Sequence, residues 1–379
     1  MKICIVSEAY PAKGEPRFPF VQQLAYSLSN EGVDCSIIAP QSITKIILRR
    51  EKRKRFFSLD INPEGKEVKV CRPSLLSFSN TKSRLLKAVF DYLFCHAIRR
   101  GIKKIGTVDA VYCYFWHVGL RTIRALQKKD FPVFIQASEC DITVPDYLKD
   151  RKYIDKVAGV VCASGKNKEE SVREGLTKAC DTIIAVNGYR KDEFYRIEKE
   201  EARKTTGISS DKFVISFLGG FIKRKGLPQL CSVLNRFDDV YSILIGQGDL
   251  VPSCKNILFK GSLDHKSIVH YLCSSDLFVL PTEAEGCCNA IIEALACGLP
   301  VISSNKPFND EILDETCSIK IDEHDEEELY NAIQKIKEDS ELQQKLSLGA
   351  LKKAESLTIE RRAIIIKEFL LSRINSDAN

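Results

Sequence analysis

The chain has 379 residues, of which 44% are hydrophobic and 28% charged, and this is the balance of a globular protein long enough for two domains. A single Met and a single Trp argue against Met-rich or aromatic binding surfaces. Residues 1–185 contain 32 Lys and Arg against 20 Asp and Glu, whereas the rest contains 25 against 31, so the net charge of +6 hides a basic N-terminal half that favours an anionic partner.

The N-terminal half begins with a predicted βαβ unit. An apolar strand at 2–7 is followed by a loop with Gly14, a helix at 20–30 and a second apolar strand at 34–39. Further short apolar runs alternate with helical patterns, at 110–113, 133–137, 159–163 and 182–186. Such alternation predicts a parallel sheet with helices on both faces.

A turn at Asn187-Gly188 and a polar stretch up to Ser210 separate the halves. The pattern then restarts, with strands predicted at 213–218, 241–245, 256–260, 277–280, 301–304 and 318–321, and C-terminal helices at 326–339, 340–355 and 359–373. The predicted fold class is α/β, with two doubly wound Rossmann-like domains facing across a cleft. The domains expected are 1–186, 187–358 and a helix at 359–379 that packs back on the first.

The cysteines and the termini suggest the compartment. Fifteen cysteines are scattered through apolar runs without a Cys-x-x-Cys pair, which argues against a disulfide framework or a zinc site and for a reducing compartment. Four apolar residues at the start are too few for a signal peptide, and no run reaches the roughly 18 apolar residues of a spanning helix. We expect a cytoplasmic protein.

The most informative stretch runs from Pro281 to Ile302. A strand ends at Leu280, a loop carries Glu285 and Gly286, and a helix beginning near Cys288 or Asn289 carries Glu293. Loop amides at a helix start bear partial positive charge, and carboxylates there can accept hydrogen bonds from sugar or ribose hydroxyls. Either Glu alone could be a solvated surface acid, but Glu293 lies in a helix that is apolar almost all round, where a lone acid is costly.

Two glycine turns complete the pattern. The loop from Leu218 to Gly226 follows the first strand of the second domain, and its glycines and cations (Lys223, Arg224 and Lys225) suit a diphosphate. An exposed basic turn is the alternative. The second turn, Gly246-Gln247-Gly248, is expected to shape the cleft rather than touch a ligand.

From Val186 to Ile302 the chain resembles the retaining glycosyltransferases of family 4, which have the GT-B fold. They share two glutamates separated by seven residues, matched by Glu285 and Glu293, followed by Ala-x-Ala-x-Gly-x-Pro-Val up to Val301. They also share the Lys-Gly step, matched by Lys225-Gly226. The N-terminal half resembles the family more loosely.

The resemblance implies roles for particular residues. Lys225 would bind the donor diphosphate, Glu285 the transferred sugar and Glu293 the ribose. The remaining donor contacts would come from Arg224, Gly220, Gly286, Cys287, Cys288 and Asn289. The family needs no metal or other cofactor, because basic groups offset the charge of the leaving group. The implied activity is retaining transfer of a hexosyl group from a nucleotide-diphosphate sugar to a glycan or lipid-linked acceptor in capsule, exopolysaccharide or lipopolysaccharide assembly.

Some positions depart from the family. Gly220 stands where many members have Arg, Ser138 where a His is frequent and Arg190 where Asp is usual. These departures leave open a catalytically inactive GT-B protein that binds a nucleotide or glycan. A sugar-nucleotide epimerase or an inverting transferase is a further alternative.

The basic N-terminal half suggests a membrane partner. Residues 45–57 carry a run of cations, and residues 85–105 mix leucines and phenylalanines with cations that include Arg99, Arg100, Lys103 and Lys104. In this family such patches suit docking to an anionic inner leaflet, although a solvated loop and a core-facing helix are the alternatives. Few aromatic residues and no recognised module argue against nucleic acid. Glu8 and Arg17 flank the first loop and could contact the acceptor. His117 follows a strand and could line the acceptor site, with a structural role as the alternative.

Overall fold

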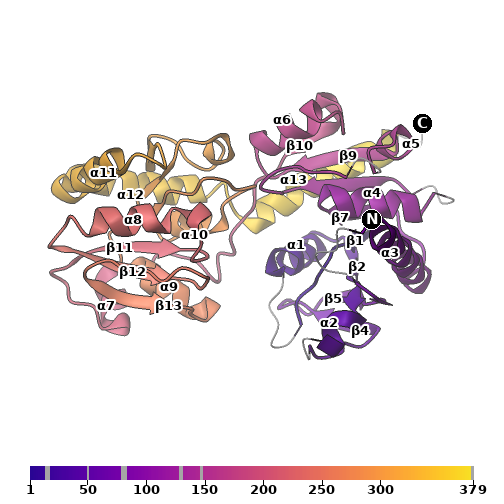
Figure 1. The fold of residues 1–379 in the computed structure, drawn as a ribbon, viewed down its shortest axis with the longest axis horizontal. Coiled ribbons are helices and arrows are strands. Elements are labelled where there is room, and N and C mark those ends of the chain that lie inside the picture. Colours follow the sequence, from indigo (N-terminus) through magenta and orange to yellow (C-terminus); the bar gives the residue numbers. More distant parts are fainter. Residues whose placement is uncertain (13–17, 49–50, 78–82, 128–130, 146–147, 377–379) are drawn as a thin grey trace. The chain divides into compact units, whose positions relative to one another are not determined.

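A computed structural model describes residues 1–12, 18–48, 51–77, 83–127, 131–145 and 148–376. The predicted Gly14 and Arg17 lie outside these residues. The chain forms two compact units (Figure 1), the first made of Met1–Ala163, Asn167–Ala185 and Ala363–Asn379, and the second of Ser164–Lys166 and Val186–Arg362. Each is an α/β unit built on a largely parallel sheet, which confirms the predicted α/β class with two Rossmann-like domains.

The first unit contains an eight-stranded sheet with the order β10-β9-β8-β7-β1-β2-β5-β4. Its strands are β1 (Lys2–Val6), β2 (Asp34–Ile38), β4 (Phe57–Ile61), β5 (Glu67–Cys71), β7 (Ala110–Tyr114), β8 (Val133–Ala137), β9 (Val157–Cys162) and β10 (Thr182–Ile184). A separate pair is formed by β3 (Gln41–Ser42) and β6 (Ser74–Leu75). β1 is paired in parallel with both β2 and β7, so the chain reverses its direction of winding between β1 and β7.

One edge of this sheet differs from the sequence prediction. β4 pairs antiparallel with β5, so the sheet is not wholly parallel. The basic run at 45–57 contributes the end of the short helix α2 (Ile43–Leu48) and the start of β4. The periodicity of β4 is hard to see in the sequence, because as an edge strand it leaves Leu59 and Ile61 half exposed or more, at 50% and 61%.

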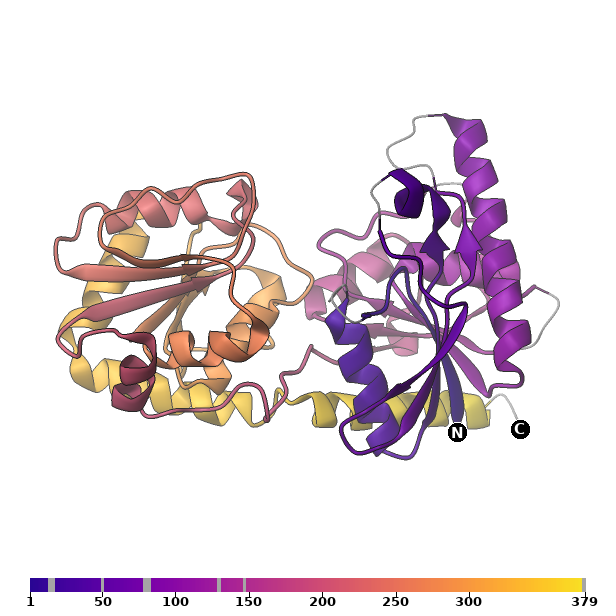
Figure 2. The ribbon, with the colours of Figure 1, turned by 90° about the horizontal axis from the view of Figure 1, so that it is seen from below.

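Helices cover both faces of the first sheet. They are α1 (Pro19–Asn30), α3 (Arg84–Ile105), α4 (Trp116–Ala125), α5 (Arg151–Ile154) and α6 (Gly165–Arg173), with a 3-10 turn η2 (Ala179–Asp181). α13 (Ile359–Ser376) begins in the second unit and joins the first from Ala363 on. There Phe369 packs edge to face on Phe134, and Ile366 and Leu370 join the same core of the first unit; Figure 2 draws this helix in yellow.

The second unit contains a six-stranded parallel sheet with the order β13-β12-β11-β14-β15-β16. The strands are β11 (Phe213–Leu218), β12 (Val240–Ile245), β13 (Ile257–Gly261), β14 (Leu277–Leu280), β15 (Val301–Ser304) and β16 (Ser318–Ile321). The helices are α7 (Lys199–Thr206), α8 (Leu227–Leu234), α9 (His265–Cys273), α10 (Asn289–Ala296), α11 (Glu326–Glu338) and α12 (Ser340–Ala354), with 3-10 turns η3 (Lys223–Lys225) and η4 (Pro307–Asn309). The predicted strands of this half agree with these bounds to within one residue.

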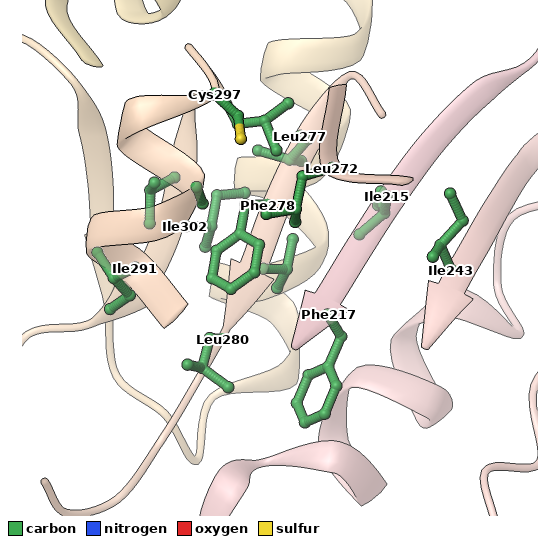
Figure 3. Packing of buried hydrophobic residues seen from close by; sticks show 14 of the residues in the cluster. Ile215, Phe217, Ile243, Leu272, Leu277, Phe278, Leu280, Ile291, Cys297 and Ile302 are labelled. Atoms are coloured by element: carbon green, nitrogen blue, oxygen red, sulfur yellow. The ribbon is translucent and has the colours of Figure 1, made fainter. Parts of the chain in front are cut away.

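The core of the second unit lies between its sheet and helices. Figure 3 shows Ile215 and Phe278 from neighbouring strands packed beside Leu272 of α9 and Ile291 of α10. All four side chains are fully buried. This packing fixes the ends of β11 and β14, from which the candidate site is built. In the part of the chain that the structure describes, no helix is both long and apolar enough to cross a bilayer.

Candidate functional site

The two loops predicted to carry the chemistry start at neighbouring strand ends in the second unit. β11 pairs in parallel with β14 through Ile215 and Leu277, and with β12 on its other side. The winding of the sheet therefore reverses between β11 and β14. The carboxyl edge at such a reversal is where doubly wound sheets bind ligands. The loop from Gly219 follows β11 there, and the loop from Pro281 follows β14.

A buried carboxylate lies between two cations at this edge. The Nζ of Lys225 donates a hydrogen bond to Oε1 of Glu285, and Nη1 of Arg224 lies 3.6 Å from the same oxygen. Thr282 also donates to Glu285 Oε1, over 3.1 Å. Glu285 is only 8% exposed. The structure thus brings together Lys225, Arg224 and Glu285, three of the predicted residues, and we call these three with Thr282 the Lys225–Glu285 cluster.

Close backbone packing holds the cluster in place. Gly226 has a φ of 70°, and a Cβ there would lie 2.1 Å from the carbonyl oxygen of Pro281. Since L side chains rarely adopt this conformation, the Lys-Gly step allows the two loops to meet. Arg224 adds bonds of its own, because its carbonyl accepts from the amide of Glu283 at 2.9 Å and its guanidinium donates to the carbonyl of Ala284.

The second glycine turn supports the first loop. A Cβ on Gly246 would lie 1.9 Å from the carbonyl oxygen of Gly219, and one on Gly248 would lie 2.4 Å from that of Phe221. The amide of Phe221 donates to the carbonyl of Gln247 at 2.9 Å. Gly220 is different, because its nearest neighbour to an added Cβ lies 3.9 Å away. A Cβ at Gly220 would therefore make only ordinary van der Waals contacts.

The start of α10 borders the cluster. Gly286 and Cys288 are buried and Cys287 is half-buried, whereas Asn289 is exposed and accepts a hydrogen bond from Nδ2 of Asn187 at 2.7 Å. Burial raises the pKa of the Cys287 thiol to about 11 and that of Cys288 to about 12. Both thiols are therefore protonated at neutral pH, which makes them poor nucleophiles.

Glu293 lies one turn further along α10, on the face that carries Asn289. It is half-buried, and burial, with a smaller contribution from Glu193, raises its pKa to about 8. Glu193 itself is paired with Arg190, whose Nη1 lies 3.4 Å from its Oε1. Among the described residues, no hydrogen bond or ion pair joins Glu293 to Lys225 or Glu285. A lone acid in this mostly apolar helix was expected to be costly, and the raised pKa of Glu293 is the consequence of that burial.

In the first unit, two candidates meet where the winding of the sheet reverses. Glu8 follows β1 and His117 follows β7, and Oε1 of Glu8 lies 2.9 Å from Nε2 of His117. The hydrogen bond to His117 lowers the pKa of Glu8. Ser138, at the position of the family's His, accepts from Nε2 of Gln136 at 2.7 Å.

Sequence reasoning missed Thr282 and Asn187 as contributors. Thr282 is the second residue after β14, and its hydroxyl contacts the carboxylate of Glu285. A polar residue directly after a buried strand at the reversal point was the available signal. The contact of Asn187 with Asn289 had no such signal, because 102 residues separate the two in the chain.

Residues 198–353 match the family model described as "Glycosyl transferases group 1". TuaC of Bacillus subtilis, assigned as a teichuronic acid biosynthesis glycosyltransferase, is 24% identical over 322 residues, 80% of this chain and 81% of TuaC. The capsular polysaccharide biosynthesis glycosyltransferase CapM of Staphylococcus aureus is 22% identical, over 78% of this chain and 84% of CapM. The chain is a glycosyltransferase.

Solved structures of other proteins are similar in fold to this glycosyltransferase. Sucrose-phosphate synthase from Thermosynechococcus elongatus gives a TM-score of 0.77 at 18% identity and covers 100% of both chains. HepE from Anabaena in complex with UDP-glucose gives 0.71 at 16% identity, over 98% of this chain and 100% of HepE. Both comparisons support the GT-B fold for the glycosyltransferase.

Proposed function

We propose that this glycosyltransferase moves a hexosyl group from a nucleotide-diphosphate sugar to a glycan or lipid-linked acceptor, with retention, during surface polysaccharide assembly. The observation that carries the proposal is the Lys225–Glu285 cluster at the reversal point of the second sheet. The names of TuaC and CapM support the polysaccharide context, and the UDP-glucose bound to HepE supports the donor class.

The residues of the Lys225–Glu285 cluster can replace their contacts with one another by contacts with a bound donor. Without a donor, the positive charge of Lys225 is offset by Glu285, and both are largely buried. A diphosphate offers stronger, doubly charged acceptors to Lys225 and Arg224. Glu285 would then accept from a sugar hydroxyl, and the amides of 286–289 would line the sugar pocket. Glu293 would accept from the ribose hydroxyls. Fixed cations of this kind stabilise the departing nucleotide, so we propose a reaction without a metal cofactor.

We also propose that the protein acts in the cytoplasm at the inner face of the membrane. The first half of α3 exposes apolar side chains, with Leu85 at 73% and Tyr92 at 66%, and Leu48 of α2 is exposed at 76%. Cations accompany them along the chain, among them Lys45, Lys52 and Lys87. Apolar burial combined with attraction to anionic lipids is the usual basis of such docking, at about 1 kcal/mol for each basic residue near the surface.

A panel of nucleotide-diphosphate sugars tests the proposal. The true donor should raise thermal stability, by about 2.7 kcal/mol at a hundredfold excess over its Kd. Release of nucleotide in the presence of a lipid extract should follow, and NMR of the product should show the anomeric configuration of the donor. Glu293→Ala should abolish turnover, whereas Glu283→Ala, two residues from Glu285 and outside the signature, should retain it.

Binding without turnover would favour the second candidate, a catalytically inactive GT-B protein that holds a nucleotide or glycan. That candidate is favoured by Gly220 and Ser138, which replace two polar residues frequent in the family. Full turnover by Glu293→Ala would contradict the role proposed for Glu293.

A further inference from the structure

A hollow lies at the carboxyl edge of the first sheet, apart from the Lys225–Glu285 cluster. It opens where β1, β2 and β5 end side by side, and it encloses about 170 Å³. Since a water molecule takes about 30 Å³ of liquid, this volume admits a phosphate-sized group with a few waters. Glu8 borders the hollow and joins it to the reversal point between β1 and β7. We call it the Arg72 hollow.

The charged residues of this hollow are mostly basic. Its cations are Lys45, Lys52, Lys54 and Arg72, and its acids are Glu8 and Glu51. A second hollow shares Gln41 and Lys54 with it and adds Arg53, Arg55 and Arg100. Seven cations thus line two adjoining hollows that contain two acids. Such an excess in concave surface concentrates anions more strongly than the same charges on a flat surface.

The basic segment is held to the sheet by hydrogen bonds. Nε2 of Gln41 donates to the carbonyl of Lys54 at 2.9 Å, and the amide of Lys54 donates back to Oε1 of Gln41 at 3.0 Å. Nε2 of Gln41 also lies 3.1 Å from the carbonyl oxygen of Arg72, at the end of β5. Gln41 therefore holds the 52–55 segment, with its cations, at the same edge of the sheet as Arg72.

Arg72 is a buried cation of this hollow whose hydrogen bonding is incomplete. It is 7% exposed, and it donates to Ser58 Oγ at 2.9 Å and to the carbonyl of Pro11 at 3.1 Å. Among the described residues, its Nε has no hydrogen-bond partner and no carboxylate lies within ion-pair distance. Burial lowers the pKa of Arg72, and the Asp60 carboxylate, which accepts from Tyr10 at 2.7 Å, offsets only part of this shift. A buried guanidinium without an anionic partner is costly, and an anion in the hollow would complete its hydrogen bonding.

Apolar side chains form the other wall. Phe90 and Phe94 of α3 line the Arg72 hollow, together with Ile46 of α2. These two helices are also the ones that expose Leu48 and Leu85 to solvent. A phosphate in the hollow could therefore be followed by a hydrocarbon chain lying over the exposed apolar surface.

We propose that the Arg72 hollow and its neighbour bind the phosphate or diphosphate group of the acceptor. The inference rests on the proposed function, since it assigns a phosphate-bearing acceptor to that reaction. The same chemistry is offered by phospholipid headgroups, and the test separates the two sources.

The test uses the full chain and inorganic pyrophosphate, titrated calorimetrically at physiological salt. The variant Lys45→Gln/Lys52→Gln removes two cations without touching the core. The matched control, Lys156→Gln/Lys178→Gln, removes the same charge at exposed positions that precede β9 and β10, on the opposite edge of the sheet. Lys225→Met serves to remove a second phosphate site in the other unit.

We expect saturable pyrophosphate binding that persists in Lys225→Met and in the control pair. Lys45→Gln/Lys52→Gln should weaken it about tenfold or more, since charge-assisted hydrogen bonds to phosphate are lost. Arg72→Gln, checked for folding by circular dichroism, should weaken it as well. Loss of binding only in Lys225→Met would overturn the inference, because pyrophosphate would then occupy the donor loop alone.

Vesicles provide the second arm. If vesicles with phosphatidylglycerol bind in a manner sensitive to Lys45 and Lys52 while pyrophosphate never saturates, the basic residues serve the bilayer and the inference is wrong. Donor binding is measured in parallel for Lys45→Gln/Lys52→Gln. If the wild type binds no donor, the proposed function is wrong. If the wild type binds a donor but no pyrophosphate, only the inference about the Arg72 hollow is wrong.

Discussion

Replacement of Lys225 by Met should destabilise the second unit, because it leaves Glu285 buried without its closest cation. Removal of one partner from a buried ion pair costs about 3–5 kcal/mol. Here Arg224 remains 3.6 Å from Glu285 Oε1 and Thr282 still donates to it, so we expect about 2–3 kcal/mol by the same principle. For a unit of this size, that loss lowers Tm by about 4–12 °C.

The double variant Lys225→Met/Glu285→Gln isolates the cause. It removes the uncompensated charge and keeps an amide oxygen that can accept from Thr282, so it should recover most of the lost Tm. Neither variant should bind the donor. Differential scanning calorimetry of the full chain, with the transition of the first unit as internal reference, measures both. If Lys225→Met melts like the wild type, or if Glu285→Gln fails to rescue it, the Lys225–Glu285 pair is not the buried contact that we describe.

Three other outcomes follow from the structure. Burial raises the pKa of Glu293 to about 8, so the folded chain retains a proton that the unfolded chain releases. The free energy of unfolding should therefore fall as pH rises from about 4.5 to 8. Urea midpoints measured across this pH range should show a smaller fall in Glu293→Gln. Gly226→Ala should cost more than about 1 kcal/mol in urea unfolding, because φ is 70° and the space is filled, while Gly220→Ala, whose Cβ would come no closer than 3.9 Å to a neighbour, should be nearly neutral. Leu85→Ser should weaken sedimentation with phosphatidylglycerol vesicles without a change in Tm, whereas Leu348→Ser, exposed to 63% in the second unit, should leave vesicle binding unchanged; equal vesicle binding by both variants would contradict docking through α3.

The fold of the second unit was readable because its strands are short, apolar and central. The buried parallel strands are mainly apolar runs, such as Phe213–Leu218, and glycines follow several of them, such as Gly219 after β11. The first unit was less readable at its edge. β4 exposes Leu59 and Ile61, so its residues carry no clear period, and the basic run before it resembled a loop.

For the candidate site, local sequence indicated which residue types lie at strand ends. Lys225 and Glu285 could each be named from a loop that follows a strand. Their contact could not, because it depends on the order of β11 and β14 in the sheet, and strand order is set by packing between distant segments. The same holds for the Arg72 hollow, whose lysines precede β4 and whose arginine follows β5.

The amino-acid sequence by itself determined the α/β class, most element positions and the chemistry available in each loop, because periodicity and turn residues act over short distances. Tertiary structure alone decided which charges meet and how deeply they are buried. It paired Glu285 with Lys225, and it placed Glu293 where desolvation raises its pKa to about 8. The apolar pattern around Glu293 already indicated that an acid there is costly, but the pairing of charges depends on neighbours far apart in the chain, which a local pattern does not specify.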